Sequence, residues 1–520
     1  MVAVSVVAGV LFEMEPVDAS AAQVSRAPAD KVFRPFDPAQ VLLLPPSVDE
    51  WLPADHLARF VAEVVDNALD LSAIYADYTE ARGYPPYDPR LMVRLLVYGY
   101  TIGVRSSRAI ERRCGDDVGF RYLAAGQVPD FRSIARFRRR HLGALAGLLL
   151  QSLRLAQRMG LVSMGRVALD GTKLRANASK HKAMSYDRVC EKEAAVAAEV
   201  AALREQIEGM LTDAETVDQA EDARFGPDGR QADLPGELAR REARLAKMRE
   251  AKAALEAEAA ERARAAAEQR ERDRQARRTH NDDDGDGDDG DGGGGAVDQQ
   301  GVAEAGQRAA AAARPKPKAQ RNFTDPQSRI MKNSDGAFIQ GYNGQAVVDQ
   351  DNQIIVGADV TDCASDCPSF TPMLDQAEAN TGTATREALV DAGYCSQENL
   401  NAAEARKAAK GTETFMATGR LKHGEHIPPA PRGRIPNNAT AKERMARKLR
   451  TNRGRAAYAR RKTIVEPVFG QMATLQDGKR LLLRGLDGAR GEWRLLAACH
   501  NFRKIFTHTG SVTVFAAATA

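Results

Sequence analysis

The chain has 520 residues, of which 43% are hydrophobic, and its net charge is only +4. This length allows three or four structural units, and no segment combines the length and apolarity of a membrane span. The six cysteines form no dense framework and no second pair stands at zinc spacing, so we expect reduced thiols in a cytoplasmic protein. Composition therefore argues against a membrane protein, a disulfide-stabilised secreted protein and a zinc protein.

The N-terminal third is predicted to be a tail followed by helices. Residues 1–35 show no clear periodicity and are predicted to be a disordered tail. Residues 36–160 are predicted to be all-helical, because segments such as HLARFVAEVVDNAL and DPRLMVRLLVYGYTIG repeat apolar residues at spacings of three and four. The later helices are basic: residues 104–142 contain ten arginines against four acids. This charge favours a polyanionic partner, although solvated helix faces would explain it equally well.

The periodicity changes after residue 160. In residues 161–183, RVALD is predicted to be a short strand that ends on Asp170, with LRANAS as a candidate hairpin partner. Residues 184–320 differ again from this strand-like segment. Their first part, to residue 275, predicts two helices folded back as a hairpin, and the Asp/Gly-rich run NDDDGDGDDGDGGGG predicts a disordered acidic linker over 281–320.

Strands return in residues 321–508. GQAVVD and QIIVGADV are predicted to form a hairpin around QDN, and EALVD and ETFM are predicted to be further strands. FTPMLDQAEANTG and SQENLNAAEARKAAKG are predicted helices, the second capped by Ser396. A basic stretch, residues 441–463, contains ten Lys or Arg against one acid and precedes the predicted helices TIVEPVFGQMATL and GEWRLLAACHNFRKIF. Residues 509–520 are predicted to be a tail.

Three carboxylates stand at similar positions in these elements. Asp170 and Asp391 end two predicted strands, and Glu466 precedes Pro467, which suits the first turn of a helix. Converging carboxylates are the oxygen ligands that Mg²⁺ prefers, and two such ions can clamp the attacking and leaving oxygens of a phosphodiester. A turn without function would also explain ALDGTK on its own. Ala168 excludes two other Asp-Gly chemistries, those of haloacid-dehalogenase-like phosphatases and covalent nucleotidyltransferases.

Arginines are the candidate DNA-binding residues of the helical region. Arg132, Arg136, Arg139 and Arg140 fall at helical spacing, so they can share one face, which can enter a major groove or line phosphates. The preceding helix, SSRAIERR, adds Arg108 and Arg112, and Arg105 lies directly before it.

Nine motifs occur in an order that resembles the bacterial insertion-sequence transposases of the DDE superfamily, over roughly residues 34–508. They are FRPFDPAQVLLLPPSVDEWLP, RSSRAIERRCGDDVGFRYLA, PDFRSIARFRRRH, ALDGTKLRANASKHK, NFTDPQSRIMK, QGYNGQAVVD, VDAGYCSQENL, IVEPVFGQM and GEWRLLAACHNFRKI. The resemblance implies an α+β multidomain protein: an all-helical N-terminal DNA-binding module, then an RNase H-like α/β catalytic domain interrupted by the long helical insertion.

The same resemblance implies the chemistry. Asp170, Asp391 and Glu466 would be the metal-binding triad, holding two Mg²⁺ ions with Mn²⁺ as a substitute. The protein would bind terminal inverted repeats, cleave DNA and transfer strands as a dimer or larger assembly associated with the nucleoid.

The sequence departs from the family around the last carboxylate. Many relatives have Tyr-(2)-Arg-(3)-Glu-(6)-Lys there. Tyr458 and Arg461 fit that pattern, but Glu466 falls one residue late and Ala473 stands in the lysine position. Lys462 is therefore a candidate for the upstream basic role, and Lys479 or Arg480 for the downstream one. Two other functions remain open: an RNase H-like endonuclease that cuts without joining, and a catalytically inactive DNA-binding derivative.

Overall fold

The computed structural model describes residues 4–7, 10–13, 47–79, 86–179, 183–221, 234–282, 298–333, 335–419, 428–429, 432–436 and 438–509. The chain forms two units, Met1–Ser47 and Val48–Ala520. In the first, β1 (Val4–Val7) pairs antiparallel with β2 (Val10–Glu13), where we predicted a disordered tail. β1 contains three valines and β2 contains Val10 and Phe12, residue types that favour strands, and only two residues separate the segments, a spacing that suits a hairpin.

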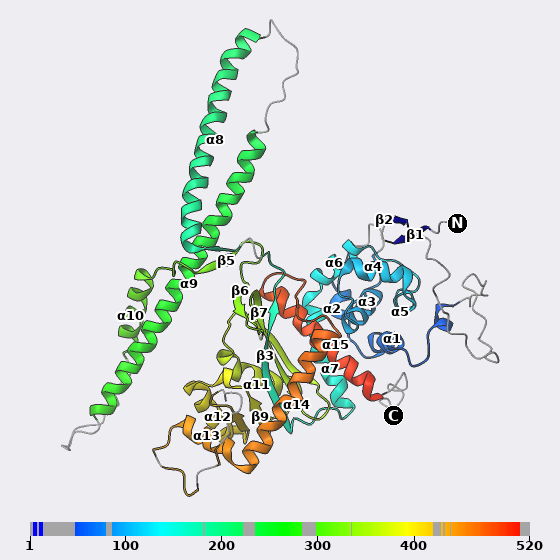
Figure 1. Ribbon diagram of the computed structural model, residues 1–520, viewed down its shortest axis with the longest axis vertical. Coiled ribbons are helices and arrows are strands. Elements are labelled where there is room, and N and C mark those ends of the chain that lie inside the picture. Colours follow the sequence, from blue (N-terminus) through cyan, green and yellow to red (C-terminus); the bar gives the residue numbers. More distant parts are fainter. Residues whose placement is uncertain are drawn as a thin grey trace, which may run out of the picture. The chain divides into compact units, whose positions relative to one another are not determined.

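The second unit begins with helices (Figure 1). After a 3₁₀ turn, Val48–Trp51, come α1 (Leu57–Asn67), α2 (Ser72–Tyr75), α3 (Pro89–Thr101), α4 (Ser107–Asp116), α5 (Val118–Leu123), α6 (Phe131–Arg140) and α7 (Leu142–Arg158). Aspartates set several of their starts. Asp88 accepts a hydrogen bond from the backbone N–H of Arg90, next to Pro89 in the first turn, and Asp130 accepts one from Arg132 at 2.6 Å. The N-terminal helical region predicted from periodicity is thus present.

A mixed sheet follows the helices. Its strands are β3 (Arg166–Arg175), β6 (Arg329–Lys332), β7 (Phe338–Asp349), β8 (Ile355–Thr361), β9 (Glu387–Val390) and β10 (Glu413–Met416), in the order β10-β9-β3-β7-β6, with β8 also paired to β7. β3, β9 and β10 run parallel, whereas β7 is antiparallel to β3, β6 and β8. The predicted hairpin around QDN is the β7–β8 connection.

The first strand of this sheet is longer than predicted. β3 passes through Asp170 and continues to Arg175, because its second half pairs with β7 from Asp170↔Ala346 to Arg175↔Gly341. The first two residues of LRANAS are therefore the end of β3, and the segment is not a hairpin partner of that strand.

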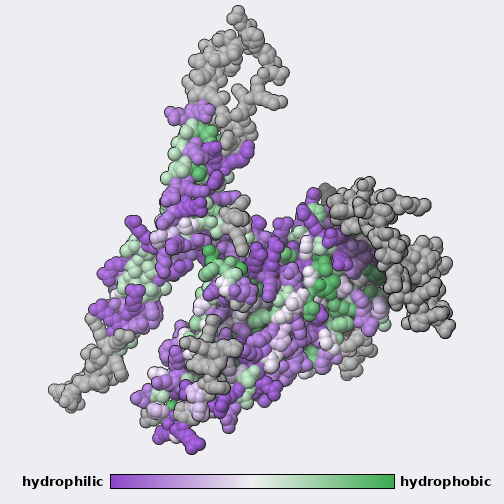
Figure 2. Space-filling view, viewed as in Figure 1, coloured by the Kyte–Doolittle hydropathy of each residue, from purple (hydrophilic) through white to green (hydrophobic). Residues whose placement is uncertain are grey.

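The segment 184–320, which the resemblance implies to be an insertion, contains three described helices. α8 (Tyr186–Glu221) and α9 (Leu234–Asp282) pack as the predicted hairpin, with Val189, Val196, Val200, Leu245 and Met248 forming its apolar seam. The hairpin leaves the sheet at a short pair of strands, β4 (Ala183–Ser185) and β5 (Gln320–Asn322). Figure 2 shows that the visible described surface of this hairpin is largely hydrophilic.

Part of the predicted acidic linker is helical. The segment 281–320, predicted to be disordered, contains α10 (Gln299–Ala312), and this helix packs on α9. Residues 283–297 lie outside the described ranges. The alanine-rich sequence of α10 has high helix propensity, and Asp298 caps it through the N–H of Gly301 at 3.0 Å.

The last helices cover the sheet. They are α11 (Phe370–Thr381), α12 (Gln397–Lys410), α13 (Ala441–Arg450), α14 (Asn452–Thr474) and α15 (Leu486–Thr509). α15 contacts α1, α3 and α7 on one side and β7 and β8 on the other, so one apolar core joins the N-terminal helices to the sheet. Trp493 on α15 donates its indole N–H to Gln345 O at 2.9 Å. Among the helices described, none is both long and apolar enough to cross a membrane.

Glu466 does not precede a helix. α14 starts at Asn452, so Pro467 lies in the helix interior and the predicted dipole stabilisation of Glu466 is wrong. Proline lacks the N–H that would bond to the carbonyl of Thr463. The side chain of Gln353 replaces it, donating Nε2–H to that carbonyl at 3.0 Å from the turn between β7 and β8. This contact explains how the proline is tolerated there.

Candidate active site

Asp170 and Asp391 come together where two parallel strands part. The last registered pair between β3 and β9 is Leu169↔Val390, so the two aspartates follow on neighbouring strands. Asp170 Oδ1 accepts the N–H of Gly171 at 2.8 Å, and Asp391 Oδ1 accepts the N–H of Ala392 at 2.6 Å at the start of the 3₁₀ turn Ala392–Tyr394. These local bonds fix both carboxylates at the same edge of the sheet.

The pair is partly shielded and carries one counter-charge. Burial raises the pKa of Asp170 above its ordinary value, and the Asp391 carboxylate adds to the rise, while Arg461 opposes it. Arg461 Nη1 lies 2.6 Å from Asp170 Oδ2, and this arginine is mostly buried. Burial also raises the pKa of Tyr458, one helical turn before Arg461 on α14. Arg461 and Tyr458 therefore belong to the surroundings of the aspartates.

Glu466 does not join the two aspartates. It is exposed on α14, and its carboxylate forms no hydrogen bond or ion pair with any described residue. Within the described ranges, no group of three or more His, Cys, Asp or Glu side chains is arranged to hold a metal ion. The residues thus fit a divalent cation only in part: the two aspartates are oxygen ligands of the right kind, and the predicted third ligand stands apart from them.

A third aspartate, which the sequence analysis did not single out, lies beside the pair. Asp366 precedes α11, and its Oδ1 accepts hydrogen bonds from Asn343 Nδ2 at 2.7 Å, Gln345 Nε2 at 2.9 Å and Lys173 Nζ at 3.2 Å. The Tyr394 hydroxyl donates to Gln345 Oε1. The donors come from strands far apart in sequence, so no local spacing could have identified this network.

Two glycines bring that network against the aspartate backbones. A Cβ on Gly171 would lie 2.5 Å from Gln345 Nε2 and 2.7 Å from Asp366 Oδ1, and one on Gly393 would lie 3.0 Å from Asp366 Oδ2. Glycine at 171 therefore lets these side-chain ends pack against β3 without being displaced. Asp366 contacts the chain one residue after Asp170 and two residues after Asp391.

Arg105 is not available to DNA. Its side chain is 1% exposed, and it forms ion pairs with Glu492 at 3.0 Å and with Asp477 at 3.0 Å. It also donates to the carbonyl of Arg480 at 2.7 Å. Arg105 therefore docks the helical region onto the segment between α14 and α15, and we remove it from the predicted DNA-binding set.

The other predicted arginines of the helical region are exposed. α4 and α6 pack together and present Arg108, Arg112, Arg132, Arg136, Arg139 and Arg140. Arg108 and Arg132 lie over the ring of Phe131, at 4.9 and 5.5 Å from its centroid. Arg140 forms an ion pair with Asp77 at 3.8 Å and donates to its backbone carbonyl. The side chains of Arg112, Arg136 and Arg139 form no hydrogen bond or ion pair with a described residue. These six remain candidates for phosphate contact.

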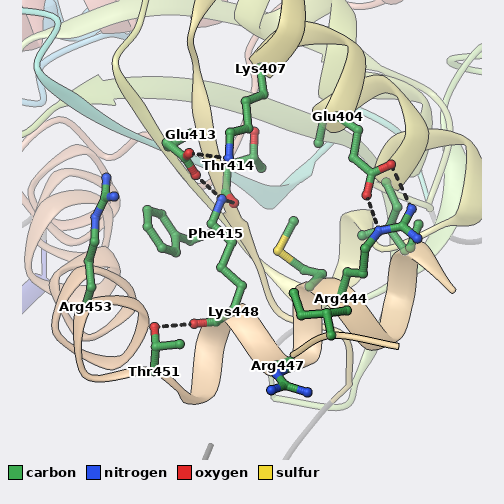
Figure 3. Close-up of a pocket in the computed structure, with 15 residues that line it drawn as sticks. Glu404, Lys407, Glu413, Thr414, Phe415, Arg444, Arg447, Lys448, Thr451 and Arg453 are labelled. Atoms are coloured by element: carbon green, nitrogen blue, oxygen red, sulfur yellow. Dashed lines mark hydrogen bonds and ion pairs between the residues drawn. The ribbon is translucent and has the colours of Figure 1, made fainter. Parts of the chain in front are cut away.

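The basic stretch 441–463 divides into paired and unpaired cations. Arg444 donates to both carboxylate oxygens of Glu404, at 2.8 and 2.9 Å. Figure 3 shows this pair, and Lys407 and Lys448 beside Glu413. Although burial opposes its ionisation, the two lysines lower the pKa of Glu413 to about 2.

These ion pairs border a pocket of about 470 Å³ between α12, β10 and α13, whose wall includes Phe415 beneath Lys448. Because its main cations are already neutralised, this pocket is not an evident anion site. Lys442, Arg460 and Lys462 are exposed and have no partner in the described part of the chain.

Comparison with known proteins decides the family. The family model "Transposase domain (DUF772)" matches residues 46–140, and the "Transposase DDE domain" matches residues 290–502. The chain belongs to the insertion-sequence DDE transposases. No curated protein and no solved structure matches it significantly.

The two matched ranges fall on different parts of the transposase fold. The first covers α1 to α6 and the second covers α10 to most of α15, including Asp391 and Glu466, whereas Asp170 lies outside both. As a DDE transposase, the protein is an enzyme that binds DNA and acts in DNA transposition, and its family generally depends on divalent metal ions.

Proposed function

We propose that this transposase binds the terminal inverted repeats of its own insertion sequence, cleaves the DNA ends in a metal-dependent reaction and joins the freed 3′-OH to target DNA. The observation that carries the proposal is the meeting of Asp170 and Asp391 at one edge of the sheet. Two ends must be brought together, so the active form would be a dimer or larger assembly.

We also infer that the sheet is the RNase H-like core interrupted by the insertion. Support comes from the strand order β8-β7-β3-β9-β10, in which the first three strands are antiparallel and the last three parallel. The insertion, from α8 to α10, lies between β3 and β6 in the sequence. It therefore does not separate Asp170 from Asp391 in space.

The chain's own groups would act as follows. Asp170 and Asp391 would bind divalent cations, with Mg²⁺ as the natural ion, Mn²⁺ as a substitute and two ions as the full complement. When bound, these ions would lower the pKa of the attacking water or 3′-OH and stabilise the leaving oxygen. Arg461 and Tyr458 would orient Asp170 and the scissile phosphate, and Glu466 would complete the site only if α14 or its side chain moved.

The positive charge of the helical region would hold the DNA. Exposed arginines on α4 and α6 would contact phosphates and set the register of the duplex, and Lys462 would do so close to the scissile strand. Most of this binding would weaken as salt rises.

A strand-transfer assay tests the proposal. Pre-cleaved ends carrying the inverted repeats that flank the gene should be joined to a plasmid target in the presence of Mg²⁺. We expect Asp170→Asn to abolish cleavage and joining while DNA affinity stays within about twofold, because the substitution removes only one charge of a ligand pair. Asp375→Asn, at an exposed aspartate of α11 paired with Arg406, serves as the control and should retain activity.

The outcomes separate the alternatives. Cleavage without joined product would identify an endonuclease instead of a transposase reaction. DNA binding without either reaction in the unchanged protein would identify an inactive derivative. Retained cleavage in Asp170→Asn would remove Asp170 from the site.

A further inference from the structure

The base of the insertion carries a basic cleft that the catalytic site does not use. The cleft holds about 420 Å³ and lies where α9 passes the segment that leads into β5. Five cations line it against one carboxylate, Glu258: Arg262, Arg314, Lys316, Lys318 and Arg329. Figure 1 shows β5 where the α8–α9 hairpin joins the rest of the chain.

The single carboxylate is already neutralised. Glu258 accepts from Arg321 at 2.7 Å and from Arg329 at 2.6 Å, and Arg262 approaches it at 3.3 Å. Arg329 is held further by Asp362 at 3.2 Å. No acid is therefore left over to balance the remaining cations of the cleft.

Three cations stay unpaired in one short segment. Arg314, Lys316 and Lys318 are exposed, and none of their side chains forms a hydrogen bond or ion pair with any described residue. Prolines 315 and 317 alternate with them, which restricts the backbone and reduces the conformational entropy that a ligand would have to remove. Alternating cations on a restricted backbone suit a ligand with regularly spaced negative charges.

The strand register relates this cleft to the aspartates. Arg329 on β6 is opposite Gly341 on β7, which is opposite Arg175 on β3. Arg175 lies five residues beyond Asp170 on that strand, which is ~17 Å, and two strand spacings add ~10 Å across the sheet. The cleft is therefore ~20 Å from Asp170, about the length of six base pairs of duplex DNA.

We propose that Arg314, Lys316 and Lys318 bind the phosphate backbone of the DNA duplex whose end occupies the Asp170–Asp391 site. This inference rests on the proposed function and adds a role for the insertion: its base extends the DNA-binding surface about half a helical turn beyond the point of cleavage. The contact is electrostatic and independent of base sequence.

Salt dependence of DNA binding tests the proposal. The full-length protein and the variant Arg314→Gln/Lys316→Gln/Lys318→Gln would be titrated with a duplex carrying the terminal repeat, over a range of salt concentrations. Loss of three phosphate contacts should reduce the slope of log K against log salt by about 2.7, since each contact contributes about 0.9. The substitutions are exposed, so the thermal midpoint should stay unchanged.

A matched variant controls for net charge. Arg204→Gln/Arg249→Gln/Arg274→Gln removes three exposed cations from the same insertion, but each of them is already paired with a glutamate. Its slope should stay close to that of the unchanged protein. Equal slopes for the cleft variant and the unchanged protein, or equal losses in the two variants, would overturn the cleft proposal. Absence of duplex binding by the unchanged protein would instead overturn the proposed function.

Discussion

Asp366 holds the candidate active site together through charge-assisted hydrogen bonds. Its Oδ1 is shared by Asn343, Gln345 and Lys173, two amides and one ammonium from β3 and β7. Because Asp366 also contacts Gly171 and Gly393, it touches the backbone beside each aspartate of the pair. We infer that it sets the separation of Asp170 and Asp391 and acts as a positioning residue.

Asp366→Asn should lower catalysis without affecting DNA binding. The amide keeps the size of the side chain but loses the charge that pairs with Lys173, and hydrogen bonds to charged groups contribute about 1.5–3 kcal/mol. We expect the cleavage rate at saturating DNA to fall at least tenfold and the concentration of Mg²⁺ needed for half-maximal rate to rise. Asp362→Asn, in the same loop, is the control and should keep the Mg²⁺ requirement; equal behaviour of both variants would contradict the positioning role.

His500 on α15 makes the stability of the molecule depend on pH. It is buried on α15 with Nε2 3.0 Å from Gln353 O, and burial lowers its pKa to about 3. The folded state therefore binds fewer protons than the unfolded state between about pH 6.5 and pH 3, so stability falls as pH falls through this window. From pH 7 to pH 5 the loss attributable to His500 should be ~2 kcal/mol.

Urea unfolding at these two pH values measures that contribution. His500→Gln keeps an N–H donor but cannot be protonated, so the difference in unfolding free energy between pH 7 and pH 5 should shrink by ~2 kcal/mol relative to the unchanged protein. An undiminished difference would assign the acid sensitivity to other groups.

At the level of elements, α14 depends on a side chain from a distant turn. Gln353 adopts φ +57° between β7 and β8, where its side chain donates to Thr463 O and accepts from Lys504 Nζ at 2.7 Å. The first bond replaces the one that Pro467 cannot make. Since α14 carries Arg461 and Glu466, this turn positions the helical side of the candidate site.

Gln353→Ala should loosen α14 specifically. It removes the bonds to Thr463 and Lys504, each worth about 0.5–1.5 kcal/mol. Amide hydrogen exchange should therefore accelerate around Pro467 on α14. Asn352→Ala in the same turn removes one bond of 3.0 Å, to Leu161 O, and should leave exchange in α14 unchanged. Equal protection of α14 in both variants would show that the helix does not need this support.

The sequence pattern predicted correctly those elements that neighbouring residues determine. Apolar alternation and turn residues identified β7 and β8, and Ser396 caps α12 through the N–H of Asn399 as expected. The predicted place of Glu466, before a helix, is wrong because proline usually starts helices. The side chain that replaces the missing bond of Pro467 belongs to Gln353, 110 residues before the Thr463 carbonyl that it binds.

The prediction of the site failed for the same reason at residues whose partners are distant in sequence. Arg105 looked like a surface cation because its counter-charge, Glu492, is 387 residues away. Asp366 gave no signal, since its donors lie on strands that meet only in the fold.

At the level of the whole molecule, a buried polar network joins the helical region to the sheet. Arg138 on α6 donates to Tyr100 Oη at 3.1 Å and to Arg105 O at 2.9 Å, and Arg105 pairs with Glu492. Glu492 Oε2 accepts two backbone N–H groups of residues 482 and 483. That segment in turn bonds to Arg175 at the end of β3, through 2.8 Å bonds to residues 479 and 481. The helix with the exposed arginines is thereby tied to the strand with Asp170.

A double-mutant cycle measures how much this junction contributes. Arg105→Met leaves the buried Glu492 carboxylate without a counter-ion, and Glu492→Met leaves buried Arg105 with only its pair to exposed Asp477. Each should therefore destabilise the protein, by about 3–5 kcal/mol for Arg105→Met and by less for Glu492→Met. In Arg105→Met/Glu492→Met no unpaired charge remains from this pair, and the loss should be smaller than the sum by about 1–3 kcal/mol.

Arg90→Met, which breaks an exposed pair with Asp88, is the control and should cost less than ~1 kcal/mol. If the junction also aligns the DNA with the aspartates, the double variant will bind the terminal repeat with unchanged affinity yet cleave it more slowly. Strict additivity of the two single losses would show that Arg105 and Glu492 stabilise the fold independently, without a shared junction.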